Sequence, residues 1–463
     1  MSAQNTVVII GGGPGGYEAA LVAAQLGAEV TVVERAGLGG AAVLTDVVPS
    51  KTLIATAEVL ATVAGAGELG ITGTRDIATD LGAVNARVRR LAAAQSGDIT
   101  ARLEKEGVHI LSGTGRLAGV AGALHRVVAT DATGAETELT ASTVLVATGA
   151  RPRALPGAEP DGERILNWTQ LYGLARLPDK LIVVGSGVTG AEFASAYHAL
   201  GAPVALVSSR DRVLPGEDPD AAELLERVFR GGGMEVLSRS RAQSVERTAD
   251  GVVVTLADGR TVEGSHCLMA VGSLPNTEDV GLAEAGVTLK ESGHIVVDRV
   301  SRTSAPGVYA AGDVTGVLAL ASVAAMQGRT AMHHALGDAV TPLNLRRVSS
   351  NVFTAPEIAT VGATQAEVDA EGGASVRLLP LGGNPRAKMQ GVHEGFVKVI
   401  ASSGSGRVLG GVIVSPRASE LIHPLTLAVS NRLTVDDVAA AFTVYPSLSG
   451  SVAEAARQLH TGS

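Results

Sequence analysis

The chain has 463 residues, of which 46% are hydrophobic and 18% are charged. This apolar content is sufficient for roughly two to four domains with cores of their own. The net charge of −9 argues against nucleic acid as a partner. The single cysteine, Cys267, excludes an intrachain disulfide and a cysteine-rich metal site, and we predict no metal.

The first residues do not have the pattern of a secretion signal. No basic segment and no small-residue cleavage site precede the first apolar stretch, and no uninterrupted apolar run reaches about 18 residues. We therefore expect a cytoplasmic protein without an integral membrane segment.

The first predicted unit is a strand, a glycine-rich turn and a helix. Residues 7–10 form a short apolar run, as in a strand that is buried on both faces of a parallel sheet. Gly11, Gly13 and Gly16 then give the G-x-G-x-x-G spacing. This spacing provides a tight turn, close approach of a pyrophosphate, and close packing of helix on strand. A helix predicted over 17–26 directs its N-terminal amides at that anion.

A second strand, predicted over 30–33, is followed by Glu34. An acidic residue about 20 residues past the glycine turn is placed to hold an adenosine ribose through its 2′-hydroxyl. Because strand, turn, helix and acid occur together, we predict a dinucleotide site here rather than a turn without a ligand. We assign to it Gly11, Gly13, Pro14, Gly15, Gly16, Glu34 and Arg35.

Helical and strand signals then alternate. Residues 52–105 are predicted to be helical with two glycine-rich interruptions, and 108–139 carry short strands and turns, as an antiparallel insertion would. Residues 144–149 form another buried strand that ends in Thr-Gly, and 151–157 contain the proline and glycine residues of a linker.

The strand–turn–helix unit occurs a second time. An apolar run over 181–184 leads into three glycines at the same spacing, Gly185, Gly187 and Gly190. The offset is 174 residues both for the first glycine (185 − 11) and for the end of the second strand (208 − 34). This internal repeat predicts two dinucleotide sites in the chain.

The second unit differs from the first at the end of its second strand, where Ser208 replaces the acid. Without a carboxylate to repel it, a 2′-phosphate becomes acceptable, and Arg210 or Arg212 can pair with it. The alternative is that both arginines are solvated turn residues. We expect NADPH to be used, with NADH as well, and assign to this site Gly185, Gly187, Val188, Gly190, Ser208, Ser209, Arg210 and Gly272.

Residues 39–51 read G-G-A-A-V-L-T-D-V-V-P-S-K. This stretch resembles the flavoprotein disulfide reductases, the family of lipoamide dehydrogenase, glutathione reductase and mercuric reductase, which read G-G-x-C-x-x-x-x-C-x-P-S-K here. Ala42 and Val47 occupy the two cysteine positions, whereas Lys51 is kept. The resemblance therefore implies the family's scaffold without its redox disulfide.

The resemblance extends over residues 5–460. It implies an α/β fold with two Rossmann-like dinucleotide-binding domains, for FAD and NAD(P), and a C-terminal α+β dimerisation domain. The expected divisions are an FAD-binding part over 1–150, an NAD(P)-binding domain over 151–275, a second FAD-binding part over 276–346 and a dimerisation domain over 347–463.

Further FAD-binding residues follow from the resemblance. Thr148 and Gly149 would lie against the cofactor, and the aspartate of the run 308–313 would bind the ribityl chain. The residues implied are Gly40, Ala41, Lys51, Gly115, Thr148, Gly149, Gly312, Asp313, Leu320 and Ala321.

Relatives with the disulfide end in H-P-T-x-x-E, a histidine base and its orienting glutamate that serve the other subunit. Here Tyr445 holds the base position and Gly450 the acid position. Two cysteines, the base and its partner are thus missing together, which indicates a branch that works without a disulfide.

The catalytic residues implied by the resemblance are Lys51, Glu192 and Tyr445. Lys51 would lie near flavin N5, paired with Glu192, where a cation favours the reduced flavin. The alternatives are a solvated lysine after a Pro-Ser turn and an acid on a helix surface. Val188 is expected to cover the nicotinamide pocket or to pack in the core, and Cys267 to be a small core residue.

Within the family, the chain resembles the NAD(P)H:quinone reductase branch. This resemblance implies hydride transfer from NAD(P)H to FAD and then to a quinone-type acceptor, in a homodimer in which Tyr445 covers the acceptor site of the other subunit. One alternative is a soluble transhydrogenase, although those generally keep the C-terminal histidine motif. The other is a redox-sensing flavoprotein, against which the presence of both Lys51 and Glu192 argues.

Overall fold

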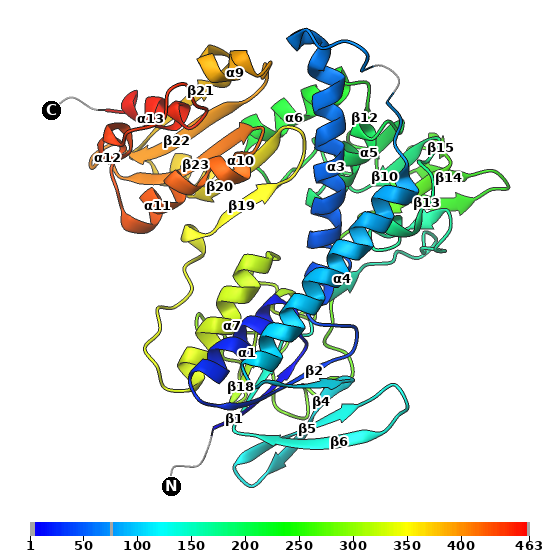
Figure 1. The fold of residues 1–463 in the computed structure, drawn as a ribbon, viewed down its shortest axis with the longest axis vertical. Helices are drawn as coiled ribbons and strands as arrows, with labels where there is room; N and C mark the ends of the chain where they lie inside the picture. Colours follow the sequence, from blue (N-terminus) through cyan, green and yellow to red (C-terminus); the bar gives the residue numbers. More distant parts are fainter. Residues whose placement is uncertain (1–4, 75–76, 461–463) are drawn as a thin grey trace. The chain divides into compact units, whose positions relative to one another are not determined.

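The computed structural model describes residues 5–74 and 77–460 (Figure 1). The chain divides into two compact units, each assembled from three stretches of sequence. The first unit comprises Met1–Thr52, Ala86–Arg153 and Gly272–Asn344, and the second comprises Leu53–Asn85, Ala154–Val271 and Leu345–Ser463. The four predicted functional divisions are not tested by this grouping and remain a prediction.

The first unit is built on a five-stranded parallel sheet of order β18-β7-β1-β2-β3. Its strands are β1 (Thr6–Ile10), β2 (Glu29–Glu34), β3 (His109–Ser112), β7 (Thr143–Val146) and β18 (Val308–Ala310). Helix α1 (Pro14–Gln25) makes the crossover from β1 to β2, as parallel neighbours require. The predicted strand, turn, helix and second strand are confirmed.

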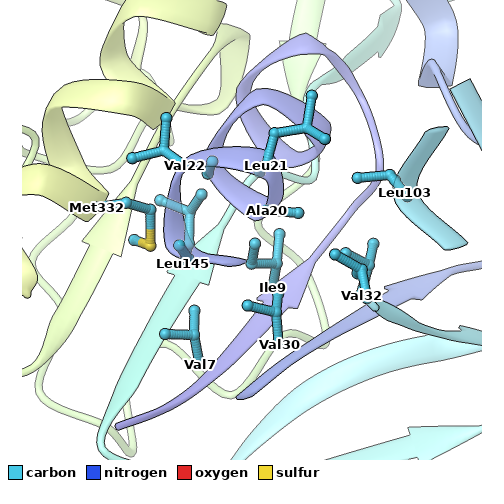
Figure 2. Packing of buried hydrophobic residues seen from close by; sticks show 14 of the residues in the cluster. Val7, Ile9, Ala20, Leu21, Val22, Val30, Val32, Leu103, Leu145 and Met332 are labelled. Carbon is cyan, nitrogen blue, oxygen red and sulfur yellow. The ribbon is translucent and has the colours of Figure 1, made fainter. Parts of the chain in front are cut away.

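Alternate residues of β1 pack on opposite faces of this sheet, the pattern of a strand buried on both sides. Val7 and Ile9 belong to the core with α1 and α7 (Ala321–Ala335), as Figure 2 shows, whereas Val8 and Ile10 belong to the core beneath. The two helices approach closely, because an added Cβ on Gly328 would lie 2.0 Å from the carbonyl oxygen of Gly15.

An antiparallel three-stranded sheet follows in the same unit. It consists of β4 (Thr114–Ala121), β5 (Leu124–Thr130) and β6 (Glu136–Ala141). The predicted insertion is therefore confirmed for these strands, but β3 pairs parallel with β2 instead. Within the predicted linker, β8 (Ala150–Pro152) pairs antiparallel with β17 (Ser273–Pro275).

Helices fill most of residues 52–105, as predicted, and the helical region begins earlier, at Gly40. They are α2 (Gly40–Leu44), α3 (Val47–Gly65), the short η1 (Ala66–Leu69) and α4 (Leu81–Lys105). One stretch of the described helices, Gly40–Leu69, is long and apolar enough to cross a membrane by length and composition alone. This stretch is not an uninterrupted apolar run, because Asp46, Lys51 and Glu58 lie within it. Core helices of soluble proteins also pass this test, so the stretch is weak evidence for a membrane span.

The second unit repeats the parallel sheet, with order β12-β11-β10-β16-β9. Its strands are β9 (Ile165–Leu166), β10 (Leu181–Val184), β11 (Val204–Val207), β12 (Glu235–Leu237) and β16 (His266–Met269). Helix α5 (Val188–Ala199) joins β10 to β11, and α6 (Pro219–Gly231) precedes β12. An antiparallel sheet of β13 (Ala242–Arg247), β14 (Val252–Leu256) and β15 (Thr261–Gly264) follows. Cys267 is fully buried in β16, and this burial raises the pKa of its thiol.

The rest of the second unit contains an antiparallel sheet of order β19-β20-β23-β22-β21. Its strands are β19 (Ser349–Val352), β20 (Glu357–Gly362), β21 (Ala374–Pro380), β22 (Phe396–Ser402) and β23 (Val408–Ser415). The helices are α8 (Gln365–Glu371), α9 (Pro385–Met389), α10 (Ala418–Leu421), α11 (His423–Asn431), α12 (Val435–Ala440) and α13 (Gly450–Arg457). The predicted α+β character of this region is confirmed.

Candidate functional site

The three fingerprint glycines of the first unit meet three different constraints. Gly11 has a φ of +103°, and an added Cβ would lie 2.3 Å from the carbonyl oxygen of Ala147. An added Cβ on Gly16 would lie 1.9 Å from the carbonyl oxygen of Gly11, because α1 packs closely on the turn. An added Cβ on Gly13 would meet nothing within 4 Å. Gly11 and Gly16 are thus required by the fold, whereas Gly13 leaves space that suits a pyrophosphate.

Helix α1 begins at this turn without a side-chain cap. Gly13 is the N-cap and Pro14 is the first helical residue. Among the described residues, five other helices, α4, α6, α8, α9 and α12, receive side-chain caps from Asp80, Asp218, Thr364, Asn384 and Thr434. An uncapped N-terminus leaves backbone N–H groups and the positive end of the helix dipole for an anion.

Glu34 ends β2 beside the glycine turn. Its Oε2 accepts a hydrogen bond from the Gly12 N–H at 2.6 Å, and its Oε1 accepts one from the Ala36 N–H at 2.7 Å. A carboxylate retains further lone pairs after two such bonds, so a fixed Glu34 can also accept from a ribose hydroxyl. Arg35 beside it is exposed.

The motif of residues 39–51 packs against the same turn. The Gly39 N–H donates to the carbonyl of Gly12 at 2.8 Å, and an added Cβ on Gly40 would lie 2.9 Å from the Cα of Gly13. Exposed Ala41 follows in α2, and half-buried Lys51 lies on α3. The start of the motif is thus fixed against the first glycine turn, whereas the position of Lys51 at that site stays a prediction.

Asp313 follows β18 by three residues and is the first residue of η3 (Asp313–Thr315). Its carboxyl is partly buried, burial raises its pKa, and no hydrogen bond from the described residues satisfies it. Gly312, with a φ of +83°, donates its N–H to Oε1 of Gln327 at 2.9 Å. A carboxyl held in this way suits a hydroxyl-bearing chain such as the ribityl group of FAD.

Several other predicted FAD residues lie in the first unit. Thr148 Oγ1 donates to the carbonyl of Asn276 at 2.7 Å, and Gly149 follows with a φ of +68°. Leu320 is the N-cap of α7 and Ala321 its first residue, again without a side-chain cap. Gly115 is required by packing, because an added Cβ would lie 3.0 Å from Cγ2 of Ile10. Whether Gly115 touches a cofactor stays a prediction.

The second unit repeats the geometry of the first turn. Gly185 has a φ of +111°, an added Cβ on Gly190 would lie 1.8 Å from the carbonyl oxygen of Gly185, and one on Gly187 would meet nothing within 4 Å. Helix α5 also lacks a side-chain cap. Val188, its first residue, is 44% exposed, so it does not belong to the core. The second turn therefore fits a dinucleotide as the first does.

Ser208 is fully buried at the end of β11. Its hydroxyl lies 2.7 Å from the hydroxyl of Ser186 and accepts a hydrogen bond from the Arg210 N–H at 3.1 Å. Ser208 thus shapes the loop, while Ser209 and Arg210 are exposed. Gly272, with a φ of +91°, follows β16 in sequence but groups with the first unit, so its assignment to this site stays a prediction.

The predicted pair Lys51 and Glu192 is divided between the two units. Glu192 is only 3% exposed on α5, and its Oε1 accepts a hydrogen bond from the Phe353 N–H at 2.9 Å. It is therefore not a helix-surface acid. The pairing of Glu192 with Lys51 stays a prediction.

A cavity of about 380 Å³ opens beside the segment that replaces the histidine motif. Tyr445, which is 82% exposed, and Gly450 both line this cavity. Asn384, the N-cap residue of α9, lines it as well. Glu454 is the one carboxylate among the described lining residues, and its bonds to Arg457 and Gln458 lower its pKa to about 2. Because this carboxylate is ionised and already accepts hydrogen bonds from Arg457 and Gln458, it does not replace the missing base.

Gln327 and Gly39 support the first site but were not singled out as site residues. Gln327 holds the turn before Asp313, and Gly39 anchors the lysine-bearing motif to the glycine turn. Gly39 is signalled by its place in the motif, whereas Gln327 lies in a helix with no local signal. Among the described residues, no group of three or more His, Cys, Asp or Glu is arranged to hold a metal ion.

Residues 5–328 match the family described as pyridine nucleotide-disulphide oxidoreductase, and residues 348–456 match its dimerisation domain. A curated relative, NAD(P)H dehydrogenase (quinone) of Mycobacterium tuberculosis H37Rv, is 55% identical over 98% of this chain and 93% of its own length. Dihydrolipoyl dehydrogenase of Zymomonas mobilis is 34% identical over 97% of this chain and 96% of its own.

Solved structures show the same similarity. The crystal structure of LpdA from Mycobacterium tuberculosis matches with a TM-score of 0.94 at 54% identity, covering 99% of this chain and 100% of that one. The HOCl-induced flavoprotein disulfide reductase RclA of Escherichia coli matches with a TM-score of 0.85 at 23% identity, covering 98% and 99%, and so shares the fold.

Proposed function

Because the chain belongs to the pyridine nucleotide-disulphide oxidoreductase family, we propose that it is an FAD-dependent NAD(P)H:quinone oxidoreductase without a redox disulfide. The observation that carries the proposal is the pair of equivalent glycine turns in a chain whose single thiol is buried in β16. Two dinucleotides fit, but no dithiol exists to take electrons onward. The relative named NAD(P)H dehydrogenase (quinone), at 55% identity, supports this choice of acceptor.

The first unit supplies the residues that would hold FAD. The open space at Gly13 and the amides of α1 would receive the pyrophosphate, Glu34 the adenosine ribose, and Asp313 the ribityl hydroxyls. FAD, when bound, supplies two-electron chemistry that no side chain of this protein provides. Positioning by several fixed groups lets each turnover begin from one orientation.

Lys51 is the proposed electrostatic residue. A half-buried ammonium close to the reacting ring would stabilise the negative charge that arrives with a hydride. Glu192, fixed by the Phe353 N–H in the second unit, is proposed to orient that ammonium. Lys51→Met should therefore slow flavin reduction by about 10²-fold, the usual effect of removing one preorganised charge. Glu192→Gln should do less, because it leaves the ammonium in place.

The acceptor side of the proposed site lacks the groups of thiol chemistry. Ala42 and Val47 replace the cysteines, and Tyr445 and Gly450 replace the base and its partner. Without a thiolate nucleophile or an imidazolium to protonate a leaving thiol, dihydrolipoamide and glutathione chemistry cannot proceed. A quinone needs neither group. We further propose a cytoplasmic homodimer, supported by the match of residues 348–456 to the dimerisation domain.

One experiment separates the candidate acceptors. The FAD-loaded protein is reduced with NADPH without oxygen and mixed with a naphthoquinone, with NAD⁺ or with lipoamide, and flavin reoxidation is followed by absorbance. We expect rapid reoxidation by the naphthoquinone and none above background by lipoamide. Faster reoxidation by NAD⁺ than by any naphthoquinone would replace the proposal with transhydrogenase activity. No reoxidation by any of them would favour a sensing role.

A further inference from the structure

We propose that Arg239 is a second specificity-determining residue for the 2′-phosphate of NADP(H), acting beside Arg210. The inference rests on the proposed function only in taking a nicotinamide dinucleotide to bind the second glycine turn. It concerns a residue in the turn after the sheet's edge strand, far along the sequence from the glycine turn and from the loop that carries Arg210.

The backbone places Arg239 beside the loop that ends β11. Strand β12 lies next to β11, and Arg239 follows two residues after its end. The Arg239 N–H donates to the carbonyl of Arg210 at 2.7 Å, and the Ser240 N–H donates to the carbonyl of Ser208 at 2.7 Å. Two short bonds thus join the turn after β12 to the strand end that corresponds, in the internal repeat, to Glu34. Ligands of such sheets bind outside the carboxyl ends of the strands, and both segments lie there.

The conformation of Arg239 is a second, independent observation. Its φ of +54° lies in the left-handed region, which favours glycine and asparagine and is costly for a side chain like arginine. Residues held in such conformations cluster at ligand-binding sites. The Arg239 N–H that bonds to the carbonyl of Arg210 belongs to this left-handed residue. The unfavourable backbone conformation therefore occurs where the backbones of the two arginines are in contact.

The charges at this strand end are a third observation. Arg210 and Arg239 are exposed, and no carboxylate among the described residues pairs with either guanidinium. Arg212, by contrast, lies 3.8 Å from the carboxylate of Asp211. The buried hydroxyl of Ser208 is already bonded within the protein. Two uncompensated guanidiniums suit a dianionic phosphate, which accepts charge-assisted hydrogen bonds, far better than they suit the 2′-hydroxyl of NADH.

The test compares two fragments of the dinucleotide on the FAD-loaded dimer. Binding of 2′,5′-ADP and of 5′-ADP is measured by titration calorimetry for the wild type, Arg239→Gly and Arg239→Lys. Glycine removes the charge and also suits the left-handed backbone, so Arg239→Gly should unfold at a temperature no lower than the wild type. We expect it to bind 2′,5′-ADP about 10- to 100-fold more weakly, the effect of one charge-assisted bond, and 5′-ADP within about twofold. Arg239→Lys should lie between.

Arg176→Met is the matched control. Arg176 is an exposed arginine of the second unit that pairs with no carboxylate among the described residues, so its loss changes the net charge equally. The control should leave both affinities within about twofold. Equal weakening of the two fragments by Arg239→Gly, or no weakening of 2′,5′-ADP, would overturn the proposal. Neither fragment is an electron donor or acceptor, so this test does not depend on quinone reduction. A protein that fails to reduce quinones can still bind 2′,5′-ADP through Arg239, and a protein that reduces quinones can fail to do so.

Discussion

The glycines of the two turns differ in what a side chain would meet at each. At Gly16 and Gly190 an added Cβ would lie within 2 Å of a carbonyl oxygen, whereas at Gly13 and Gly187 it would meet no protein atom within 4 Å. The first pair is thus needed for folding, and the second pair only for a ligand. Sequence spacing predicted these separate roles because a glycine turn is local, with each constraint set by residues close along the chain.

We predict that Gly13→Val abolishes FAD binding without unfolding the apoprotein. The valine enters space that only a pyrophosphate would use, and the φ of −67° at Gly13 is one that any residue adopts. Flavin absorbance after dialysis against FAD and the melting temperature of the apoprotein give the two readouts. Gly187→Val should bind FAD normally and lose affinity for NADPH.

The matched control is Gly16→Ala. Its methyl group is smaller than the valine side chain but would lie 1.9 Å from the carbonyl oxygen of Gly11. This variant should melt at a lower temperature even without cofactor. If Gly13→Val lowers the apoprotein melting temperature as much as Gly16→Ala does, the open space at Gly13 is not reserved for a ligand.

A second prediction concerns the pH dependence of Asp313. Burial raises its pKa, so its ionised form destabilises the folded apoprotein. The penalty is absent below the ordinary aspartate pKa of about 3.9 and reaches its full size above the raised value. We expect Asp313→Asn to raise the apoprotein melting temperature at neutral pH, with the difference shrinking as the pH falls towards 4, and to weaken FAD binding. An unchanged difference across this range would show that ionisation of Asp313 is not the cause.

Other site features depend on residues distant in sequence and were not predictable from spacing. Glu192 is held by the N–H of Phe353, which is 161 residues away. The burial of Ser208 depends on Ser186 across the turn, and the position of Arg239 on the pairing of β11 with β12. No periodicity or motif encodes such contacts, since they arise only when separate elements pack.

At the scale of elements, the spacing of apolar residues and the local composition predicted the longer strands and helices. Strand β10 occupies 181–184 as predicted, because four consecutive apolar residues before a glycine turn are typical of a buried parallel strand. Strand β3 was assigned to the wrong sheet. With only four residues it shows no clear alternation, and its pairing with β2 depends on how α4 returns the chain to the sheet edge.

A buried ion pair joins two elements of the second unit. Lys398 of β22 is 1% exposed, and its Nζ lies 2.7 Å from Oδ2 of Asp218 and 2.6 Å from Oδ2 of Asp220. Asp218 also caps α6 through the N–H groups of Asp220 and Ala221. One lysine thereby ties the helix before β12 to the C-terminal sheet.

We predict that Lys398→Met lowers the free energy of unfolding by about 3–5 kcal/mol, because it leaves the Asp218 carboxylate buried without its cation. Urea denaturation measures the effect. The double variant Lys398→Met with Asp218→Asn should recover most of it, since asparagine is neutral and caps a helix as well as aspartate does. A double variant no more stable than the single one would mean that lost packing, not the unpaired charge, is responsible.

At the scale of the whole molecule, the compact units combine stretches that are far apart in sequence. Residues 53–85 group with the second unit although they lie between two parts of the first. The sequence predicts one discontinuous division, the FAD-binding parts over 1–150 and 276–346, but no motif marks residues 53–85 as belonging to a different unit from their neighbours in sequence. The C-terminal segment carries Phe442, Val444 and Tyr445 as exposed apolar residues in the single chain, which fits the family's dimerisation domain that this region matches.

The last prediction tests whether each proposed acceptor site is shared between two subunits. We predict that Lys51→Met and Tyr445→Asp homodimers both reduce quinones slowly, the first through a lost charge and the second through a charge placed in an apolar wall. If Tyr445 of one subunit covers the site at Lys51 of the other, a mixed dimer contains one site with both native residues and one with neither. Mixed dimers, purified with two different affinity tags after subunit exchange, should then recover about half of the wild-type rate per dimer. If both residues serve a site in their own subunit, every site in the mixed dimer carries one substitution and no recovery occurs. Full activity of the Tyr445→Asp homodimer would instead remove Tyr445 from the site altogether.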